Sequence, residues 1–220
     1  MKNLIKHLIL IFLIFCFLTV SYNLFIKDRI IENMDLKKRR IILLGDSVFD
    51  NRSYVGETDS IHYLLDHHDI IKSTIIASDG AKIANLNDQL QSVKKDLLNK
   101  KITLFISVGG NDIYDYNKTD NCKDYVDKIF DKYTTIINNY SFNCKLVLCN
   151  IYTPTSEKNT TKAKCIKIWN NKLSEYCLQN SYILFPLDSI LNKPSDFTDK
   201  IEPSKTGGRK IVNELLTYMD

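Results

Sequence analysis

Short apolar runs of strand length alternate along most of the chain with longer segments whose apolar residues recur about every 3.6 positions. Strand-length runs lie at residues 41–44, 73–77, 102–108, 145–150 and 182–185, and helical periodicity covers residues 61–65, 83–98, 125–137, 164–178 and 205–218. This alternation is typical of βαβ units, which build parallel sheets. Because such units connect through right-handed crossovers, we predict an α/β fold. The expected form is a three-layer α/β/α sandwich around a five-stranded parallel sheet of strand order 2-1-3-4-5.

A continuous apolar stretch precedes this alternation. Residues 8–20 are apolar except for Thr19, and the apolar character continues to Ile26. As a helix, residues 4–26 are long enough to span a membrane, although the purely apolar part also fits the central region of a signal peptide. No Ala-x-Ala cleavage site is present and the apolar character continues past Ser21. We therefore predict an uncleaved single-pass membrane anchor, with secretion after signal-peptide cleavage as the alternative.

Three regions follow from this reading of the chain. We expect a transmembrane anchor or signal peptide at residues 1–27, a polar stalk at 28–38, and one globular domain at 39–220, which is large enough to bury a core. Basic residues between positions 27 and 40 outnumber those before the apolar stretch, and such a basic flank favours a cytoplasmic domain. Glycosylation sequons at Asn51, Asn117, Asn139 and Asn159 would favour a lumenal domain. The sequence therefore leaves both sides of the membrane as alternatives for the domain.

Charge and cysteine content narrow the range of partners. The net charge of +4 is too weak to indicate nucleic-acid binding, and the one basic cluster, residues 37–40, adjoins the apolar segment and indicates contact with a membrane surface. Five of the six cysteines fall in the domain, an odd number without any Cys-x-x-Cys spacing. We therefore predict neither a zinc site nor a disulfide framework.

Polar residues follow three of the predicted strands at the points where these strands end. The sequence GDSV at residues 45–48 carries Ser47 after the first run, Gly80 follows the second, and GGND at residues 109–112 carries Asn111 after the third. The carboxyl ends of parallel strands meet at one edge of a sheet, where ligands bind in open α/β folds. Taken singly, Ser47 could cap a turn, Asn111 could bond its own loop and Gly80 could supply a left-handed turn. Together they indicate an ester-hydrolase site.

These segments resemble the first three signature blocks of the GDSL-type (SGNH) hydrolase family, and the resemblance extends over residues 39–220. It implies a flavodoxin-like hydrolase fold with Ser47 as the nucleophile. It also implies an oxyanion hole formed by the N–H groups of Ser47 and Gly80 and the side chain of Asn111. The implied substrates are small esters, such as acetyl groups on glycans or acyl chains of lipids, and the chemistry requires no cofactor or metal. Asp46 and Asp112 are expected to brace their loops.

The fourth block departs from the family pattern. The family usually has Asp-x-x-His there, whereas this chain has Asp199 followed three residues later by Glu202. His62, His67 and His68 are expected on or near a helix that leads away from Ser47.

Two interpretations of Glu202 remain. In the active one, Glu202 accepts the Ser47 proton, and like-charge repulsion from Asp199 raises its pKa toward a useful range. In the inactive one, Glu202 braces a helix start, and the domain is a binding module for acylated glycans or lipids at a membrane. We favour the active interpretation because Ser47, Gly80, Asn111 and Asp199 are all retained.

Overall fold

The computed structural model describes Phe17, residues 19–22, Phe25 and residues 39–116, 121–154 and 160–219. The chain divides into two compact units, Met1–Lys38 and Arg39–Asp220, each described by itself. In the first unit the described residues are helical. The rest of the expected anchor and the whole expected stalk lie outside the described residues. Within the described part of the chain, no helix has both the length and the apolar character needed to cross a membrane. The anchor at 1–27 and the stalk at 28–38 stay predictions.

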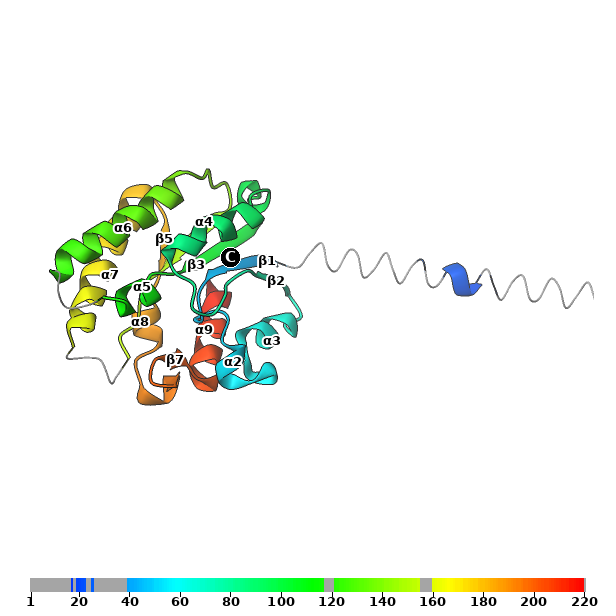
Figure 1. Cartoon of the computed structure of the whole chain (residues 1–220). Coiled ribbons are helices and arrows are strands. Elements are labelled where there is room, and N and C mark those ends of the chain that lie inside the picture. Colours follow the sequence, from blue (N-terminus) through cyan, green and yellow to red (C-terminus); the bar gives the residue numbers. More distant parts are fainter. Residues whose placement is uncertain are drawn as a thin grey trace, which may run out of the picture. The chain divides into compact units, whose positions relative to one another are not determined.

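The core of the second unit is the predicted parallel sheet (Figure 1). Its strands are β1 (Arg39–Gly45), β2 (Ile71–Ile75), β3 (Ile102–Ser107), β4 (Lys145–Cys149) and β5 (Ile183–Phe185). Their order is β2-β1-β3-β4-β5, and every neighbouring pair is parallel. The predicted fold class and strand order are therefore confirmed, and β1 lies inside the sheet with β3 beside it.

Helices cover both faces of the sheet because successive side chains of a strand point to opposite faces. In β1, Ile42 and Leu44 join the core beneath α4, α6 and α7, whereas Ile41 and Leu43 join the core beneath α3 and α9 (Figure 1). The helices are α2 (Arg52–Val55), α3 (Ile61–Asp66), α4 (Ile83–Ser92), α5 (Gly110–Tyr114), α6 (Cys122–Asn138), α7 (Thr161–Asn180), α8 (Leu187–Ile190) and α9 (Lys205–Thr217).

Several element boundaries differ from the predictions. The helical pattern at 83–98 divides into α4 and a 3-10 helix, η2 (Asp96–Leu98). Helix α6 begins three residues before the predicted start, because the Asn121 side chain caps it by accepting a hydrogen bond from Lys123 N–H. A short antiparallel hairpin, β6 (Phe197–Thr198) and β7 (Glu202–Pro203), was not predicted, since two-residue strands are too short to show an alternating pattern.

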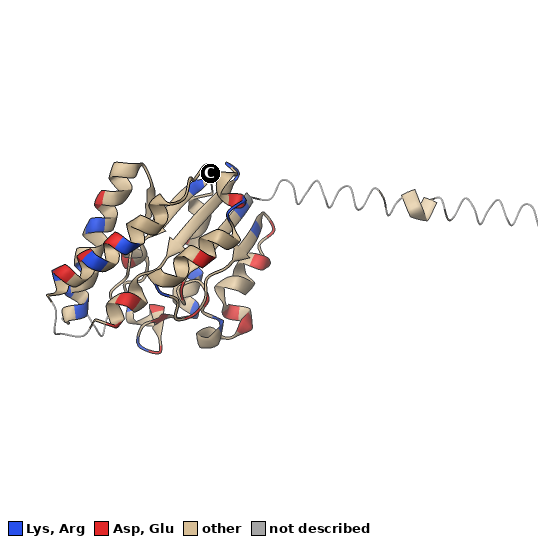
Figure 2. Ribbon diagram, turned by 45° about the horizontal axis from the view of Figure 1, so that its top comes forward, with Lys and Arg blue, Asp and Glu red and all other residues tan. Residues whose placement is uncertain are grey.

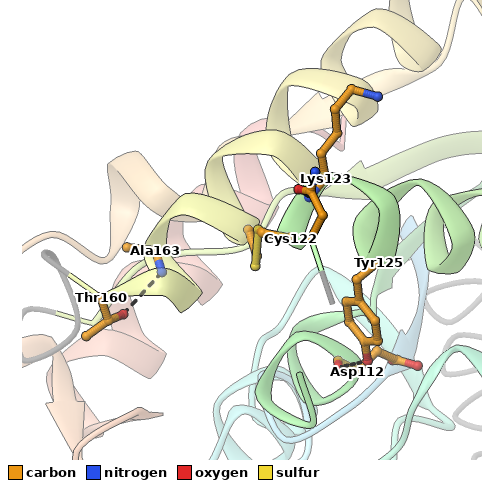
Figure 3. The surroundings of a disulfide bond; sticks show 8 residues. Asp112, Cys122, Lys123, Tyr125, Thr160 and Ala163 are labelled. Atoms are coloured by element: carbon orange, nitrogen blue, oxygen red, sulfur yellow. Dashed lines mark hydrogen bonds between the residues drawn. A yellow bond between two sulfur atoms is a disulfide. The ribbon is translucent and has the colours of Figure 1, made fainter. Parts of the chain in front are cut away.

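The cysteines correct a second prediction. Cys122 and Cys165 form a disulfide between the first residue of α6 and the second turn of α7, and these helices pack against each other (Figure 3). The same view shows Tyr125 reaching Asp112, whose carbonyl oxygen accepts the Tyr125 hydroxyl at 2.6 Å. The prediction of no disulfide was wrong because the two cysteines are 43 residues apart and only the packing of α6 on α7 brings them together. Cys144, Cys149 and Cys177 are free and buried.

Charged residues of both signs are interspersed along the helices in the view of Figure 2, while the central strands carry few. Ion pairs join several of these groups, among them Lys172 and Asp127 between α7 and α6.

Candidate active site

Ser47 follows a strand end that is fixed from two directions. Gly45, the last residue of β1, has φ +130°, and an added Cβ would overlap the carbonyl oxygen of Ser107 on β3. The Gln89 side chain on α4 bonds both backbone groups of Gly45, accepting from its N–H at 2.7 Å and donating to its carbonyl at 2.9 Å. The Asp46 N–H donates to the Ser107 carbonyl at 3.0 Å. The start of the turn that carries Ser47 is therefore held against both β3 and α4.

Ser47 lies in the wall of a small cavity of ≈ 40 Å³ at this edge of the sheet. Ser47 is only 6 % exposed. Asp46 braces the turn as expected, since its Oδ1 accepts the Val48 N–H at 3.1 Å. The polar groups of the cavity wall include Asp46, Ser47, Asn111 and Glu202, and the apolar part includes Ile151, Tyr152, Leu187 and Ile201. The cavity thus combines a hydroxyl, an amide and two carboxyl groups with an apolar wall.

Glu202 reaches this cavity on the β6–β7 hairpin. The Tyr152 hydroxyl, from the segment after β4, donates to the Ile201 carbonyl at 2.8 Å and so ties the hairpin to the sheet edge. At the base of the hairpin, the Ser204 N–H donates to the Asp196 carbonyl at 2.8 Å, and Asp196 pairs with Lys210 of α9 at 2.7 Å. These contacts hold the segment on both sides of Glu202.

The Glu202 carboxylate is buried and faces the Ser47 hydroxyl. Burial raises the pKa of Glu202, the hydrogen bond with Ser47 opposes this shift, and the negative charges of Asp79 and Asp199 add to it. Oε2 of Glu202 is buried and accepts no hydrogen bond from the described residues. A raised pKa and a free oxygen beside a hydroxyl are the properties of a group that can accept a proton.

Asn111 lies on α5, directly after the Gly109 turn that ends β3. Its Nδ2 donates one hydrogen bond to the Ala81 carbonyl at 3.0 Å and has a second hydrogen available. This bond connects α5 to the loop that contains Gly80. Asp112 braces the same loop as expected, since its Oδ2 accepts the Ile83 N–H at 3.0 Å.

Gly80 is exposed, with φ +73°, and it is outside the set of residues that line the cavity. Nothing lies within 4 Å of the position that a Cβ would take. Within the part of the chain that the structure describes, the N–H groups of Ser47 and Gly80 donate no hydrogen bond. Both donors are therefore unpaired within the described residues, and that of Ser47 belongs to a residue of the cavity wall.

Asp199 occupies a different position from the one expected for a partner of Glu202. It lies at the exposed tip of the hairpin, where Asp199 and Lys200 both have positive φ, 44° and 73°. It makes no hydrogen bond to other described residues. Burial is the first cause of the raised pKa of Glu202, and Asp79 comes before Asp199 among the charges. Asp199 therefore raises the pKa of Glu202 in the expected direction, but it contributes less than burial and less than Asp79.

The structure adds residues that sequence reasoning did not single out. Asp79 accepts the Tyr54 hydroxyl at 3.0 and 2.9 Å, and Tyr152 positions the hairpin. The position of Asp79 before Gly80 was a signal, but nothing in the sequence connects Tyr54 or Tyr152 to the site. No histidine occurs among the described residues that line the cavity. His62 lies on α3, with Nε2 3.7 Å from Oδ1 of Asp50.

The described residues include no cluster of three or more His, Cys, Asp or Glu side chains placed to hold a metal ion. The carboxyl groups at the cavity are Asp46 on the turn after β1 and Glu202 on the hairpin. What the arrangement offers is a hydroxyl, a proton acceptor and several N–H donors around one cavity. These groups suit the transfer of an acyl group to the hydroxyl.

A parallel α/β/α sandwich that presents a serine after its first strand is a fold shared by many hydrolases. The family model of GDSL-like Lipase/Acylhydrolase matches residues 41–215, and the chain belongs to this family. The resemblance seen in the signature blocks is thereby confirmed. No curated protein sequence matches the chain.

Solved structures share the fold at low sequence identity. A member of the lipolytic protein G-D-S-L family from Veillonella parvula has a TM-score of 0.64 and 14% identity, over 81% of this chain and 97% of that one. The psychrotrophic esterase EstA from a Pseudoalteromonas species has a TM-score of 0.62 and 16% identity, over 82% and 96%. A catalytic mutant of the acetylxylan esterase Axe2 from Geobacillus stearothermophilus has a TM-score of 0.63 and 10% identity, over 82% and 94%.

Proposed function

We propose that the chain is a serine ester hydrolase in which Ser47 is the nucleophile and Glu202 is the base. The observation that carries this proposal is that the buried Glu202 carboxylate faces the Ser47 hydroxyl inside one cavity. Membership of the GDSL-like Lipase/Acylhydrolase family supports ester chemistry at this place in the fold.

In the proposed reaction, Oγ of Ser47 attacks the ester carbonyl carbon while Glu202 takes the hydroxyl proton. The carbonyl oxygen becomes an oxyanion, which then collapses and expels the alcohol, and Glu202 returns the proton to the leaving oxygen. Water, deprotonated by the same carboxylate, then attacks the acyl carbon; the bond to Oγ of Ser47 breaks, the acid is released, and Glu202 returns the proton to Oγ. A carboxylate with an ordinary pKa is a weak base at neutral pH, and the burial that raises the pKa of Glu202 improves the match.

The oxyanion requires donors that are already in position. We assign this role to the N–H of Ser47, the N–H of Gly80 and the second hydrogen of Asn111 Nδ2. The hydrogen bond from Asn111 Nδ2 to the Ala81 carbonyl uses one hydrogen of the amide and fixes its orientation. The second hydrogen of Nδ2 remains for the oxyanion. Loss of one such donor typically lowers the rate by about 10²- to 10³-fold. We give Asp199 a minor role in this proposal, as an exposed negative charge at the hairpin tip and not as a partner that orients the base.

The cavity size supports small acyl groups as substrates. The cavity of ≈ 40 Å³ is small, which favours a short acyl group over a long chain. The apolar wall formed by Ile151, Tyr152 and Leu187 suits the methyl end of such a group. One structural neighbour is an acetylxylan esterase. We therefore propose short acyl esters on glycans or lipids, with activity falling from p-nitrophenyl acetate to the octanoate.

The test is hydrolysis of p-nitrophenyl acetate by the full-length chain purified in detergent. We expect Ser47→Ala and Glu202→Gln to lose at least about 10³-fold in kcat/KM. Matched controls are Ser73→Ala, on the edge strand β2, and Glu175→Gln, on the exposed side of α7, which keep the parent rate. Equal rates for all five proteins would reject the enzyme and favour the alternative, an inactive binding module, which a glycan and lipid binding screen would then examine.

We further propose that residues 1–27 anchor the protein in a membrane and that the domain faces an oxidising compartment. The Cys122–Cys165 disulfide supports this side, because disulfides persist in oxidising compartments and are rare in the cytosol. Among the described sequons, Asn139 is exposed, whereas Asn51 is buried and its Oδ1 accepts the Ile61 N–H at 2.9 Å. Protease protection of a carboxyl-terminal tag in sealed vesicles tests the proposal. If the tag is digested by a protease that reaches only the cytosolic side of the membrane, the proposed orientation is wrong.

A further inference from the structure

Two buried carboxyl groups line the cavity without a basic partner. Asp46 is 4 % exposed and Glu202 is 8 % exposed, and both belong to its wall. Among the described residues that form this wall, none is Lys, Arg or His. Two buried negative charges in the wall of one small cavity repel each other strongly, so such pairs retain a proton on one member. The chemistry of this site therefore depends on which of the two carboxyl groups is protonated.

The surroundings of the two groups indicate which one holds the proton. Glu202 faces the Ser47 hydroxyl, which stabilises its ionised form. Asp46 is buried and accepts one hydrogen bond from the described residues, from the Val48 N–H, and the charge of Asp112 acts on it in addition to that of Glu202. Burial raises the pKa of Asp46 to about 8, the Val48 N–H opposes the shift, and Glu202 and Asp112 add to it.

We propose that Asp46 and Glu202 carry a single negative charge between them at neutral pH, with Asp46 a neutral carboxylic acid and Glu202 the carboxylate that faces Ser47. This inference rests on the proposed hydrolase function for its kinetic consequence, but not for the charge state itself. Asp46 is then a positioning residue, which keeps a second charge away from the reacting atoms.

The consequence follows from where Asp46 lies. It directly precedes Ser47, and its Oδ2 lies 3.9 Å from the position of a Cβ added to Gly110, next to Asn111. The oxyanion would form between these residues. An ionised Asp46 places a negative charge beside a developing negative charge in a region of low dielectric, which slows the reaction. The rate is therefore expected to fall as Asp46 ionises above neutral pH.

The other titratable groups around Asp46 do not account for such a fall. Glu202 from β7 and Asp112 from α5 are the acids that face it. Cys149 at the end of β4 and Tyr152 after it also sense its charge, and burial raises the pKa of each well above its ordinary value, so both stay neutral at pH 8. The pKa of Asp112 is raised by burial as well, which makes Asp112→Asn the matched control.

The direct test is a carboxyl ¹³C NMR titration of the full-length chain with labelled aspartate. We expect one Asp signal to titrate near pH 8, to vanish in Asp46→Asn, and to titrate at lower pH in Glu202→Gln, where the second carboxyl group has gone. Its persistence in Asp46→Asn would overturn the proposal. So would the lack of any Asp signal titrating between pH 6 and 9, or an unchanged titration in Glu202→Gln. The Glu202→Gln variant keeps Asp46 in place. If Asp46→Asn does not fold, the titration of the Asp signal in Glu202→Gln therefore still tests the proposal.

The kinetic test uses the ratio of kcat/KM at pH 9 to that at pH 7 with phenyl acetate. For a group that titrates at about 8, the protonated fraction falls about tenfold between these values. We expect that loss in the parent and in Asp112→Asn, and a ratio near 1 in Asp46→Asn. The same alkaline loss in Asp46→Asn would overturn the kinetic role. A protein that hydrolyses no ester but shows the NMR titration would refute the proposed function and leave the charge pairing established.

Discussion

The bond between Tyr152 and the hairpin offers a way to separate the position of Glu202 from its chemistry. Tyr152→Phe removes only the hydroxyl that donates to the Ile201 carbonyl at 2.8 Å. A hydrogen bond of this kind contributes about 0.5–1.5 kcal/mol, and an unsatisfied buried carbonyl costs about 1–3 kcal/mol. Ile201 is half-buried, so water can reach its carbonyl, and we expect a loss near the lower end, about 1 kcal/mol. For a domain of this size, that lowers Tm by about 2–4 °C.

The catalytic effect of Tyr152→Phe should exceed its effect on stability. The hairpin places Glu202 against Ser47, and small displacements of catalytic groups reduce rates steeply. We expect kcat to fall roughly tenfold with KM unchanged, because the substitution leaves the substrate-facing ring in the wall. Tyr140→Phe is the control: it loses the exposed hydrogen bonds from Tyr140, just after α6, to Asn87 on α4, outside the cavity. A lowered Tm with unchanged kcat would refute the positioning role.

Three further outcomes can be measured on the same protein. Gly207→Ala should lower the free energy of unfolding in urea by about 1–3 kcal/mol, because the added Cβ overlaps the Asp196 carbonyl oxygen; an unchanged midpoint would contradict this packing. Reduction of the Cys122–Cys165 disulfide should lower it by at most about 4 kcal/mol for a 43-residue separation, with no effect of reductant on a double serine variant. The pKa of Asp46 is raised to about 8 in the folded state, so the native protein holds a proton that the unfolded chain releases above about pH 4. Stability from this group should therefore be greatest at low pH and decline as the pH rises from 4 to 8, and Asp46→Asn should remove that slope in a series of Tm measurements.

The parts of the fold that could be predicted from sequence are those set by long apolar patterns. The runs that became β1, β3 and β4 are buried over almost their whole length and read as apolar segments, whereas the edge strands β2 and β5 are only partly buried. Right-handed crossovers then leave few strand orders open. Helix ends were less certain, because capping by Asn121 or Thr160 depends on single polar residues outside the periodic segment.

The site divides in the same way. Ser47, Gly80 and Asn111 follow strand ends, so the pattern that predicts the strands also places these residues at one edge. Glu202 could be expected there only by resemblance, because it lies on a hairpin of two-residue strands. The exposure of Asp199 depends on the positive φ angles of that turn, and an Asp-Lys sequence does not predict positive φ angles. The disulfide and the Tyr152 bond join residues from distant segments, so no local pattern could reveal them.

The β6–β7 hairpin has a consequence for how this scaffold can change. It is a separate two-stranded unit, outside the parallel sheet and attached to it by side-chain contacts and by α9. Because its two strands pair only with each other, we expect that it could be replaced without breaking a main-sheet pairing. Exchanging it would install a different acid or base opposite the same hydroxyl and leave the five main strands untouched.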